Sequence, residues 1–251
     1  MIDVHTHLLP GVDDGSPSAD VSIPILARFA ADGVQIVVCT PHLDASRAAA
    51  APYERHLEIL ASLRAAAVES PELKLGWEIM LDQPGADLRD RRLSLGGSSA
   101  VLVEFPRMMI PPNASEELFR LRMSGIVPVL AHPERYWGCT VERVEEWRRV
   151  GAVIQTDVAG VFASGPQGTV AASLLEEGLV DLLASDTHGD SRALLPAHRW
   201  LTELGADDAA DLLTRRNAAH LLANEPIEPV PPIGRRRGVF DRLKELLLGS
   251  R

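Results

Sequence analysis

Histidine and acidic residues stand at the ends of the hydrophobic runs of this chain. His5 and His7 close the first run, and because one residue separates them, both side chains point to the same side of a strand. Five later runs end in, or are soon followed by, residues of the same kind: His42, Glu78, Glu104, His132, and Asp186 with His188. Imidazole and carboxylate ligands together suit Zn, Mn or Fe. The pattern therefore predicts a transition-metal centre built from distant segments.

The elements that must position these residues alternate between short apolar runs and longer amphipathic ones. We predict strands at 1–4, 35–40, 73–77, 100–105, 127–131, 152–156 and 180–184, and helices at 19–32, 52–69, 115–124, 141–150, 167–177, 196–204 and 207–222. Strands separated by helices indicate an α/β fold with a parallel sheet, either an open doubly wound sheet or a closed barrel. In a parallel barrel the carboxyl ends of the strands gather at one face, where the predicted ligands would meet.

The composition excludes several classes of function. The chain has 251 residues, a formal net charge of −10 and only 4% aromatic residues. A general nucleic-acid binder would need a basic face or stacking side chains, so that class is disfavoured. Its two cysteines, Cys39 and Cys139, build no disulfide framework. No secretory leader and no apolar stretch of about 18 residues is visible, so a cytoplasmic protein is expected.

The histidines and cysteines outside the pattern have ordinary interpretations. His56 lies in mid-helix beside charged residues and is expected on the solvated surface. His198 and His220 lie in predicted helices and carry no assigned chemistry. Cys39 is expected as a small core residue, and Cys139 has no partner that would make it a nucleophile.

The C-terminal residues differ from the body in composition. Residues 228–238 are rich in Pro and Arg and are expected as a linker, and residues 239–249 have apolar side chains near helical spacing. Residues 235–251 hold six basic and two acidic side chains, so they carry +4 and residues 1–234 carry −14. We expect a body at 1–227 and a tail at 228–251. The tail would rest on an anionic membrane surface or a membrane-bound partner, or pack on the body or a neighbouring subunit.

The order of short motifs resembles that of the PHP superfamily of metal-dependent phosphoesterases: H-x-H, D-D-G, P-H, G-x-E, E-F-P, A-H-P-E-R and S-D-x-H. The chain is most similar to the branch of capsule and exopolysaccharide-biosynthesis tyrosine-protein phosphatases, through MIDVHTHLLPGVDDG, LVEFP, PVLAHPER and ASDTH. The resemblance covers residues 1–227.

This resemblance implies a single-domain, distorted (β/α)7 TIM-like barrel that holds three divalent metal ions, expected to be manganese, with iron and zinc as alternatives. It implies a first metal on His5, His7, Glu78 and Asp186, a second on Glu78, Glu104 and His132, and a third on Asp14, His42 and His188. Asp14 is preferred to Asp13 because the family's ligand is the acid just before the glycine.

The implied reaction is hydrolysis of phosphotyrosine by water that the metal ions activate. The Cys-x5-Arg loop of a cysteine-dependent route is absent from the sequence. Arg135, three residues after His132, is the candidate for binding phosphoryl oxygens, with a structural salt bridge to Glu134 or a helix acid as its alternative role. Arg192 is a second candidate. The implied substrate is the phosphotyrosine tail of a membrane-bound bacterial tyrosine kinase that controls polysaccharide synthesis.

Other functions compete with this one. A small-molecule phosphatase of the same superfamily, with a histidinol-phosphate-like substrate, is the main alternative, although short loops favour an open site. The loops at 43–54 and 189–196 depart from the family pattern, which leaves substrate preference open. A binding module with a degenerate centre is disfavoured because all nine expected ligands are present. An amidohydrolase would need a carboxylated lysine on a middle strand, whereas Lys74 stands at a strand start. The oligomeric state is left open.

Overall fold

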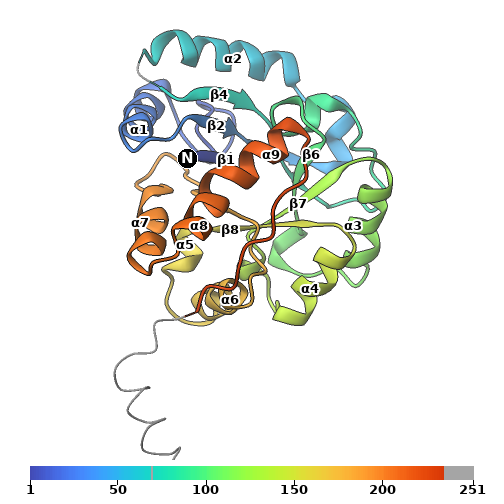
Figure 1. Ribbon diagram of the computed structural model, residues 1–251. Helices are drawn as coiled ribbons and strands as arrows, with labels where there is room; N and C mark the ends of the chain where they lie inside the picture. Colours follow the sequence, from blue (N-terminus) through green and yellow to red (C-terminus); the bar gives the residue numbers. More distant parts are fainter. Residues whose placement is uncertain (69, 235–251) are drawn as a thin grey trace, which may run out of the picture.

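Parallel strands alternate with helices in the computed structural model, which describes residues 1–68 and 70–234 (Figure 1). The strands are β1 (Ile2–Thr6), β2 (Ile36–Cys39), β3 (His42–Asp44), β4 (Glu72–Leu75), β5 (Glu78–Met80), β6 (Ala100–Glu104), β7 (Val127–Ala131), β8 (Val153–Asp157) and β9 (Leu182–Ala184). The helices are α1 (Ala19–Ala31), α2 (Tyr53–Ala66), α3 (Ala114–Met123), α4 (Val141–Arg149), α5 (Val158–Val161), α6 (Pro166–Glu176), α7 (Leu195–Glu203), α8 (Asp207–Asp211) and α9 (Asn217–Ala223). The predicted α/β class is confirmed.

Helix ends follow local chemistry. Ser18 precedes α1 in an extended conformation, and Gly33 follows its end with a φ of 84°, a conformation that glycine adopts without strain.

The single helix predicted over 207–222 is instead divided, because a π-helical turn (Leu212–Arg216) separates α8 from α9. Thr214 lies in this wider turn, and its Oγ1 atom is 3.0 Å from Nδ1 of His198 on α7. This contact joins the π-helical turn to α7.

The strands form two parallel sheets, with the orders β1-β2-β4 and β3-β5-β6-β7-β8-β9. Strands β3 and β5 are not among the predicted strands. Each continues the path of an earlier strand after a two-residue interruption, Thr40-Pro41 between β2 and β3 and Gly76-Trp77 between β4 and β5. Pro41 has no N–H to donate to a ladder, which accounts for the first interruption. A Cβ at Gly76 would lie 2.9 Å from Leu95 Cδ2, so a larger residue at the second interruption would force the side chain of Leu95 to shift.

The first and last strands also lie side by side. Asp186 N, two residues beyond β9, donates to the carbonyl of His5 at 3.0 Å. His7 N donates to the carbonyl of Thr187 at 2.9 Å. The carboxyl ends of β1 and β9 are therefore adjacent, and residues that follow them meet at one edge.

The strands are buried on both faces, because side chains such as Val4, Leu102 and Val129 from different strands pack on one another and helices surround the sheets (Figure 1). Cys39 is fully buried in this core and Cys139 is buried as well, as predicted for the former. The prediction that His56 is solvated is wrong, because the residue is only 6% exposed and its ring stacks on that of Trp77 with the ring centroids 4.7 Å apart. The face of α2 that carries His56 packs on the Gly76-Trp77 interruption, a contact that mid-helix position alone does not reveal.

Residues 228–234, expected as part of a linker, lie against the body. Val230 and Ile233 are buried, and Ile233 N donates to the carbonyl of Leu175 at 2.9 Å. Residues 235–251, which include the predicted amphipathic segment, lie outside the described residues. Among the helices of residues 1–68 and 70–234, none combines the length and apolar character needed to cross a membrane.

Candidate metal centre

Nine side chains from seven segments converge at one end of the sheets, where β1, β6, β7 and β9 end and where the interruptions after β2 and β4 lead into β3 and β5. Their ligand atoms form four overlapping groups in which all atoms lie within 4.8 Å of one another. Across the described part of the chain, these groups contain only the nine predicted ligands: His5, His7, Asp14, His42, Glu78, Glu104, His132, Asp186 and His188. The topology thus brings together residues up to 183 positions apart, from His5 to His188.

The most buried group has the spacing of a metal coordination shell. His5 Nε2 lies 3.2 Å from each of His7 Nε2, Glu78 Oε2 and Asp186 Oδ1. His7 Nε2 lies 3.2 Å from the same Glu78 oxygen and 3.3 Å from the same Asp186 oxygen. Donor atoms bound at about 2.0–2.1 Å to one tetrahedral cation lie roughly 3.3 Å apart. This donor set therefore fits a divalent transition-metal ion.

Glu78 connects this group to a second one. Its Oε1 atom lies 2.7 Å from His132 Nε2, and Glu104 Oε2 lies 3.8 Å from the same nitrogen. The two oxygens of Glu78 therefore face different groups of imidazoles, which is the arrangement of a carboxylate that bridges two cations.

The third group lies nearer to solvent. Asp14 Oδ1 is 3.2 Å from His42 Nε2 and 3.6 Å from His188 Nε2, and the Asp14 side chain is 71% exposed. The neighbouring acid has a different contact, since Asp13 Oδ2 lies 2.7 Å from His7 Nδ1. Asp13 therefore orients a predicted ligand instead of joining the group, a contact that the motif alone does not reveal. Gly15, which follows Asp14, must lack a side chain because a Cβ there would lie 2.3 Å from both the Cβ and the carbonyl oxygen of His7.

Two of the nine residues have strained backbones. His132 has a φ of 35° and Asp186 a φ of 48°, in the left-handed region that favours glycine. Such strain costs on the order of 1–3 kcal/mol per residue and is concentrated at functional sites. In both cases it occurs where the chain leaves a strand and turns a side chain into the cluster.

The electrostatics of the cluster call for added positive charge. Burial lowers the pKa of His5, but Glu78 and Asp186 outweigh this effect and raise the pKa to about 9. Burial raises the pKa of Glu78, yet the surrounding histidines hold it well below its ordinary range. Burial and the charge of Glu78 together raise the pKa of Glu104. Buried carboxylates this close to one another need protons on the imidazoles or bound cations.

Both predicted arginines lie at the same carboxylate. Arg135 Nη2 contacts Asp186 Oδ2 and also pairs with buried Asp157, so its partners are neither Glu134 nor a helix acid. Arg192 Nη1 lies 3.0 Å from the same Asp186 oxygen, and its Nη2 lies 2.9 Å from His188 Nδ1. Two guanidinium groups thus border the cluster, each about one-quarter exposed.

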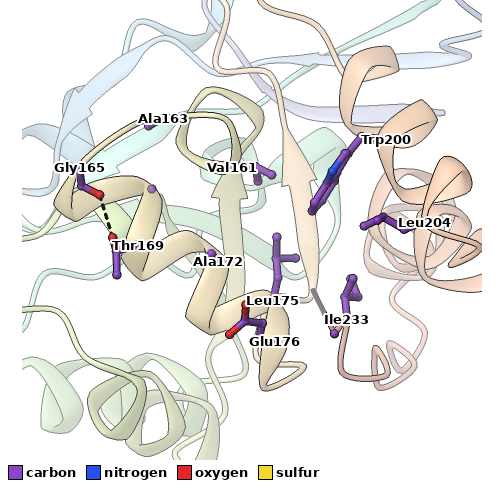
Figure 2. Close-up of a pocket in the computed structure, with 12 residues that line it drawn as sticks. Val161, Ala163, Gly165, Thr169, Ala172, Leu175, Glu176, Trp200, Leu204 and Ile233 are labelled. Atoms are coloured by element: carbon purple, nitrogen blue, oxygen red, sulfur yellow. Dashed lines mark hydrogen bonds between the residues drawn. The ribbon is translucent and has the colours of Figure 1, made fainter. Parts of the chain in front are cut away.

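One cavity borders the cluster through His42, whereas others lie apart from the nine residues. One of about 290 Å³ is bordered by α6, α7 and Ile233, and its apolar walls include Leu175, Trp200 and Leu204 (Figure 2). It contains none of the nine predicted ligands.

The chain is similar to known proteins over most of its length. A family model described as "Capsular polysaccharide synthesis, CpsB/CapC" matches residues 1–223. Tyrosine-protein phosphatase YwqE of Bacillus subtilis (strain 168) is 27% identical over 255 residues, which cover 94% of this chain and 98% of that protein. Tyrosine-protein phosphatase CpsB of Streptococcus pneumoniae is 30% identical over 209 residues, which cover 76% and 85%.

A solved structure supports the same relationship. It comes from work titled "Crystal structures of YwqE from Bacillus subtilis and CpsB from Streptococcus pneumoniae, unique metal-dependent tyrosine phosphatases". It matches this fold with a TM-score of 0.75 and 26% identity, over 94% of this chain and all of that one. These matches agree with the resemblance that the motifs predict.

Proposed function

The chain belongs to the CpsB/CapC family of capsular polysaccharide synthesis, and we propose that it is a metal-dependent protein-tyrosine phosphatase. The observation that carries the proposal is the convergence of nine metal-type ligands beside two arginines, in a family whose relatives YwqE and CpsB are tyrosine-protein phosphatases. Its substrate in the cell would be a tyrosine-phosphorylated protein, and we propose the membrane-bound kinase of polysaccharide synthesis.

We propose that the strands close into a distorted (β/α)7 barrel. If β2 with β3 and β4 with β5 each count as one interrupted strand, seven strand positions follow one another in parallel order. The hydrogen bonds that join residues after β9 to those of β1 support closure of the ring. We also propose a body and a C-terminal tail that contacts an anionic membrane through residues 235–251. Because residues 228–234 pack on the body, we move the predicted boundary of the tail from 227 to 234.

The nine residues would hold three divalent ions, for which manganese is the expected metal, in the groups that the sequence predicts. When bound, such ions supply positive charge to phosphate oxygens and lower the pKa of a water molecule toward neutrality. The carboxylate of Asp13 contacts Nδ1 of His7 and so holds the His7 ring in place. Arg135 and Arg192 would bind the remaining phosphoryl oxygens in a fork that matches their geometry. The tyrosine leaving group has a pKa of about 10, so it departs more readily than an alkoxide.

Two exposed apolar side chains favour a polypeptide substrate over a small molecule. Trp137 is 81% exposed and Met109 is 54% exposed, and a β-bridge joins their loops. These loops follow β6 and β7 at the edge that carries the cluster, and Trp137 is two residues beyond Arg135. Arg107 and Met108, with φ values of 55° and 52°, hold the first loop in a strained conformation. A peptide that flanks a phosphotyrosine could pack on this surface, whereas a small metabolite would not reach it.

A substrate panel tests the proposed function. With Mn²⁺ added to the full-length protein, we expect a phosphotyrosine peptide to be hydrolysed with a higher kcat/KM than either a phosphoserine peptide or histidinol phosphate. The phenolate released from phosphotyrosine is a better leaving group than the alkoxides released from phosphoserine and histidinol phosphate. We therefore expect a lower kcat/KM for both of these competitors. A preference for histidinol phosphate would overturn the proposal in favour of a small-molecule phosphatase.

A variant of the exposed tryptophan tests the polypeptide surface. We expect Trp137→Ala to lower kcat/KM for a phosphotyrosine peptide by about tenfold, as expected for the loss of about 1–2 kcal/mol of aromatic packing. The fall for p-nitrophenyl phosphate should be smaller because this substrate has no flanking residues. Phe162→Ala removes a half-exposed aromatic ring beside Trp200 and serves as the matched control. Equal losses on both substrates would contradict a peptide-binding role for Trp137.

A further inference from the structure

We infer that Gln155, supported by Asp157, is a positioning residue that fixes the tautomer and direction of His5 within the metal centre. The inference rests on the proposed metal centre and extends it to residues that lie in none of the recognised motifs. It begins with β8, which is the one of the seven strand positions in the described part of the chain that supplies no candidate ligand.

Gln155 and Asp157 point into the same region because they are two residues apart on β8. Both are 0% exposed. A fully buried amide and a fully buried carboxylate need hydrogen-bond partners, since an unsatisfied polar group in the interior is costly. Thr156, between them, points to the opposite side of the strand.

The contacts of these two residues close a ring with the candidate site. Gln155 Oε1 lies 2.9 Å from His5 Nδ1, and Gln155 Nε2 donates to Asp157 Oδ1 at 2.9 Å. Asp157 Oδ2 pairs with Arg135, whose guanidinium also contacts Asp186 Oδ2. Asp186 Oδ1 lies 3.2 Å from His5 Nε2. Each member of the ring therefore constrains its neighbours on both sides.

The direction of each hydrogen bond follows from chemistry. An ionised carboxylate only accepts hydrogen bonds, so Gln155 must turn its NH₂ group toward Asp157. Its carbonyl oxygen then faces His5, whose Nδ1 atom must donate. His5 Nε2 is consequently the nitrogen whose lone pair is available to a cation. Asp157 thus sets the tautomer of His5 through the amide of Gln155.

The comparison with His7 shows why an amide is suited to this position. His7 Nδ1 is oriented directly by a carboxylate, that of Asp13, near the solvent-exposed group. A carboxylate at position 155 would instead face that of Asp157 with no hydrogen atom between them. One of the two would have to take up a proton, and the donor to Asp157 would be lost.

Metal affinity tests the inference. The full-length protein and its variants are stripped with a chelator and titrated with Mn²⁺ by calorimetry. Outer partners of metal ligands typically contribute about 10–100-fold to affinity, so we expect losses of this size for Gln155→Leu and Gln155→Glu. Thr156→Val, which changes a buried side chain on the opposite face of the same strand, should retain the wild-type affinity. Wild-type affinity in both Gln155 variants would overturn the inference.

A second measurement separates positioning from a general loss of stability. In the Zn²⁺-loaded, ¹⁵N-histidine-labelled protein, we expect a slowly exchanging Nδ1–H resonance of His5 that is absent from Gln155→Leu. A merely structural role would lower the melting temperature of the chelator-stripped protein but would leave this resonance and the affinity in place. Failure of the wild-type protein to bind either metal would instead overturn the proposed metal centre, so the two failures are distinguishable.

Discussion

Replacing Glu78 with glutamine is expected to remove bound metal and to lower phosphatase activity by about 10³-fold or more. Glu78 is 1% exposed, and its two oxygens contact the imidazoles of His5, His7, His42 and His132 at 2.7–3.2 Å. The amide keeps the shape of the side chain but removes the negative charge. Cations at a phosphoryl centre contribute several kcal/mol, and each 1.36 kcal/mol corresponds to a factor of ten in rate.

Metal content by inductively coupled plasma mass spectrometry and turnover of a phosphotyrosine peptide check this prediction together. Asp181→Asn is the matched control, because Asp181 is equally buried but pairs with Arg148 and accepts a hydrogen bond from Ile154 N. It lies just before β9, at the opposite end from the cluster, so the control should lower stability and leave metal content intact. Full metal occupancy and activity in Glu78→Gln would contradict the bridging role.

Except for Asp14, the positions of the candidate ligands are predictable because each stands at the end of, or soon after, a recognisable run of apolar, strand-forming residues. VLVE ends in Glu104 and VPVLA leads directly to His132, so once the strands are parallel, their ends must meet. The choice of Asp14 over Asp13 came from the family resemblance, and the structure places the two acids in different contacts. Sequence and topology together therefore define the candidate site.

Other features depend on packing that no local pattern encodes. In the sequence, Gln155 and Asp157 of β8 are not distinguished from other polar residues of a strand. Their role becomes visible only in the structure, where Gln155 contacts both His5 and Asp157. A signal is nonetheless present, since Gln155 and Asp157 alternate at the end of a predicted strand, 152–156, that no predicted ligand follows. His56 was misplaced because its contact with Trp77 comes from a distant interruption in the sheet. Strands β3 (HLD) and β5 (EIM) lie outside the predicted strands because neither contains an apolar run like the one that marks β9, which has the same length.

Arg135 is expected to be the second most sensitive position. We expect Arg135→Ala to lower kcat by about 10²–10³-fold, because removal of one preorganised group that stabilises transition-state charge typically has an effect of this size. Its guanidinium is three-quarters buried between Asp157 and Asp186 and faces the cluster. Arg135→Lys should not restore turnover, because a compact ammonium group cannot span two carboxylates and also bind phosphoryl oxygens in a fork. Arg192→Ala should have a smaller effect, since its guanidinium is also committed to Asp190.

Inhibition by inorganic phosphate distinguishes the two roles open to Arg135. If the guanidinium binds phosphoryl oxygens, Arg135→Ala retains most of its metal but requires a much higher phosphate concentration for half-maximal inhibition. If Arg135 acts only as a salt bridge that holds Asp186, the variant loses metal as Glu78→Gln does, and phosphate inhibition of the metal-saturated enzyme is unchanged. Wild-type turnover in Arg135→Lys would show that charge alone suffices and would contradict the fork. The ion pair with Asp186 is compatible with either role, because Arg135 has further N–H groups beyond those that contact the two carboxylates.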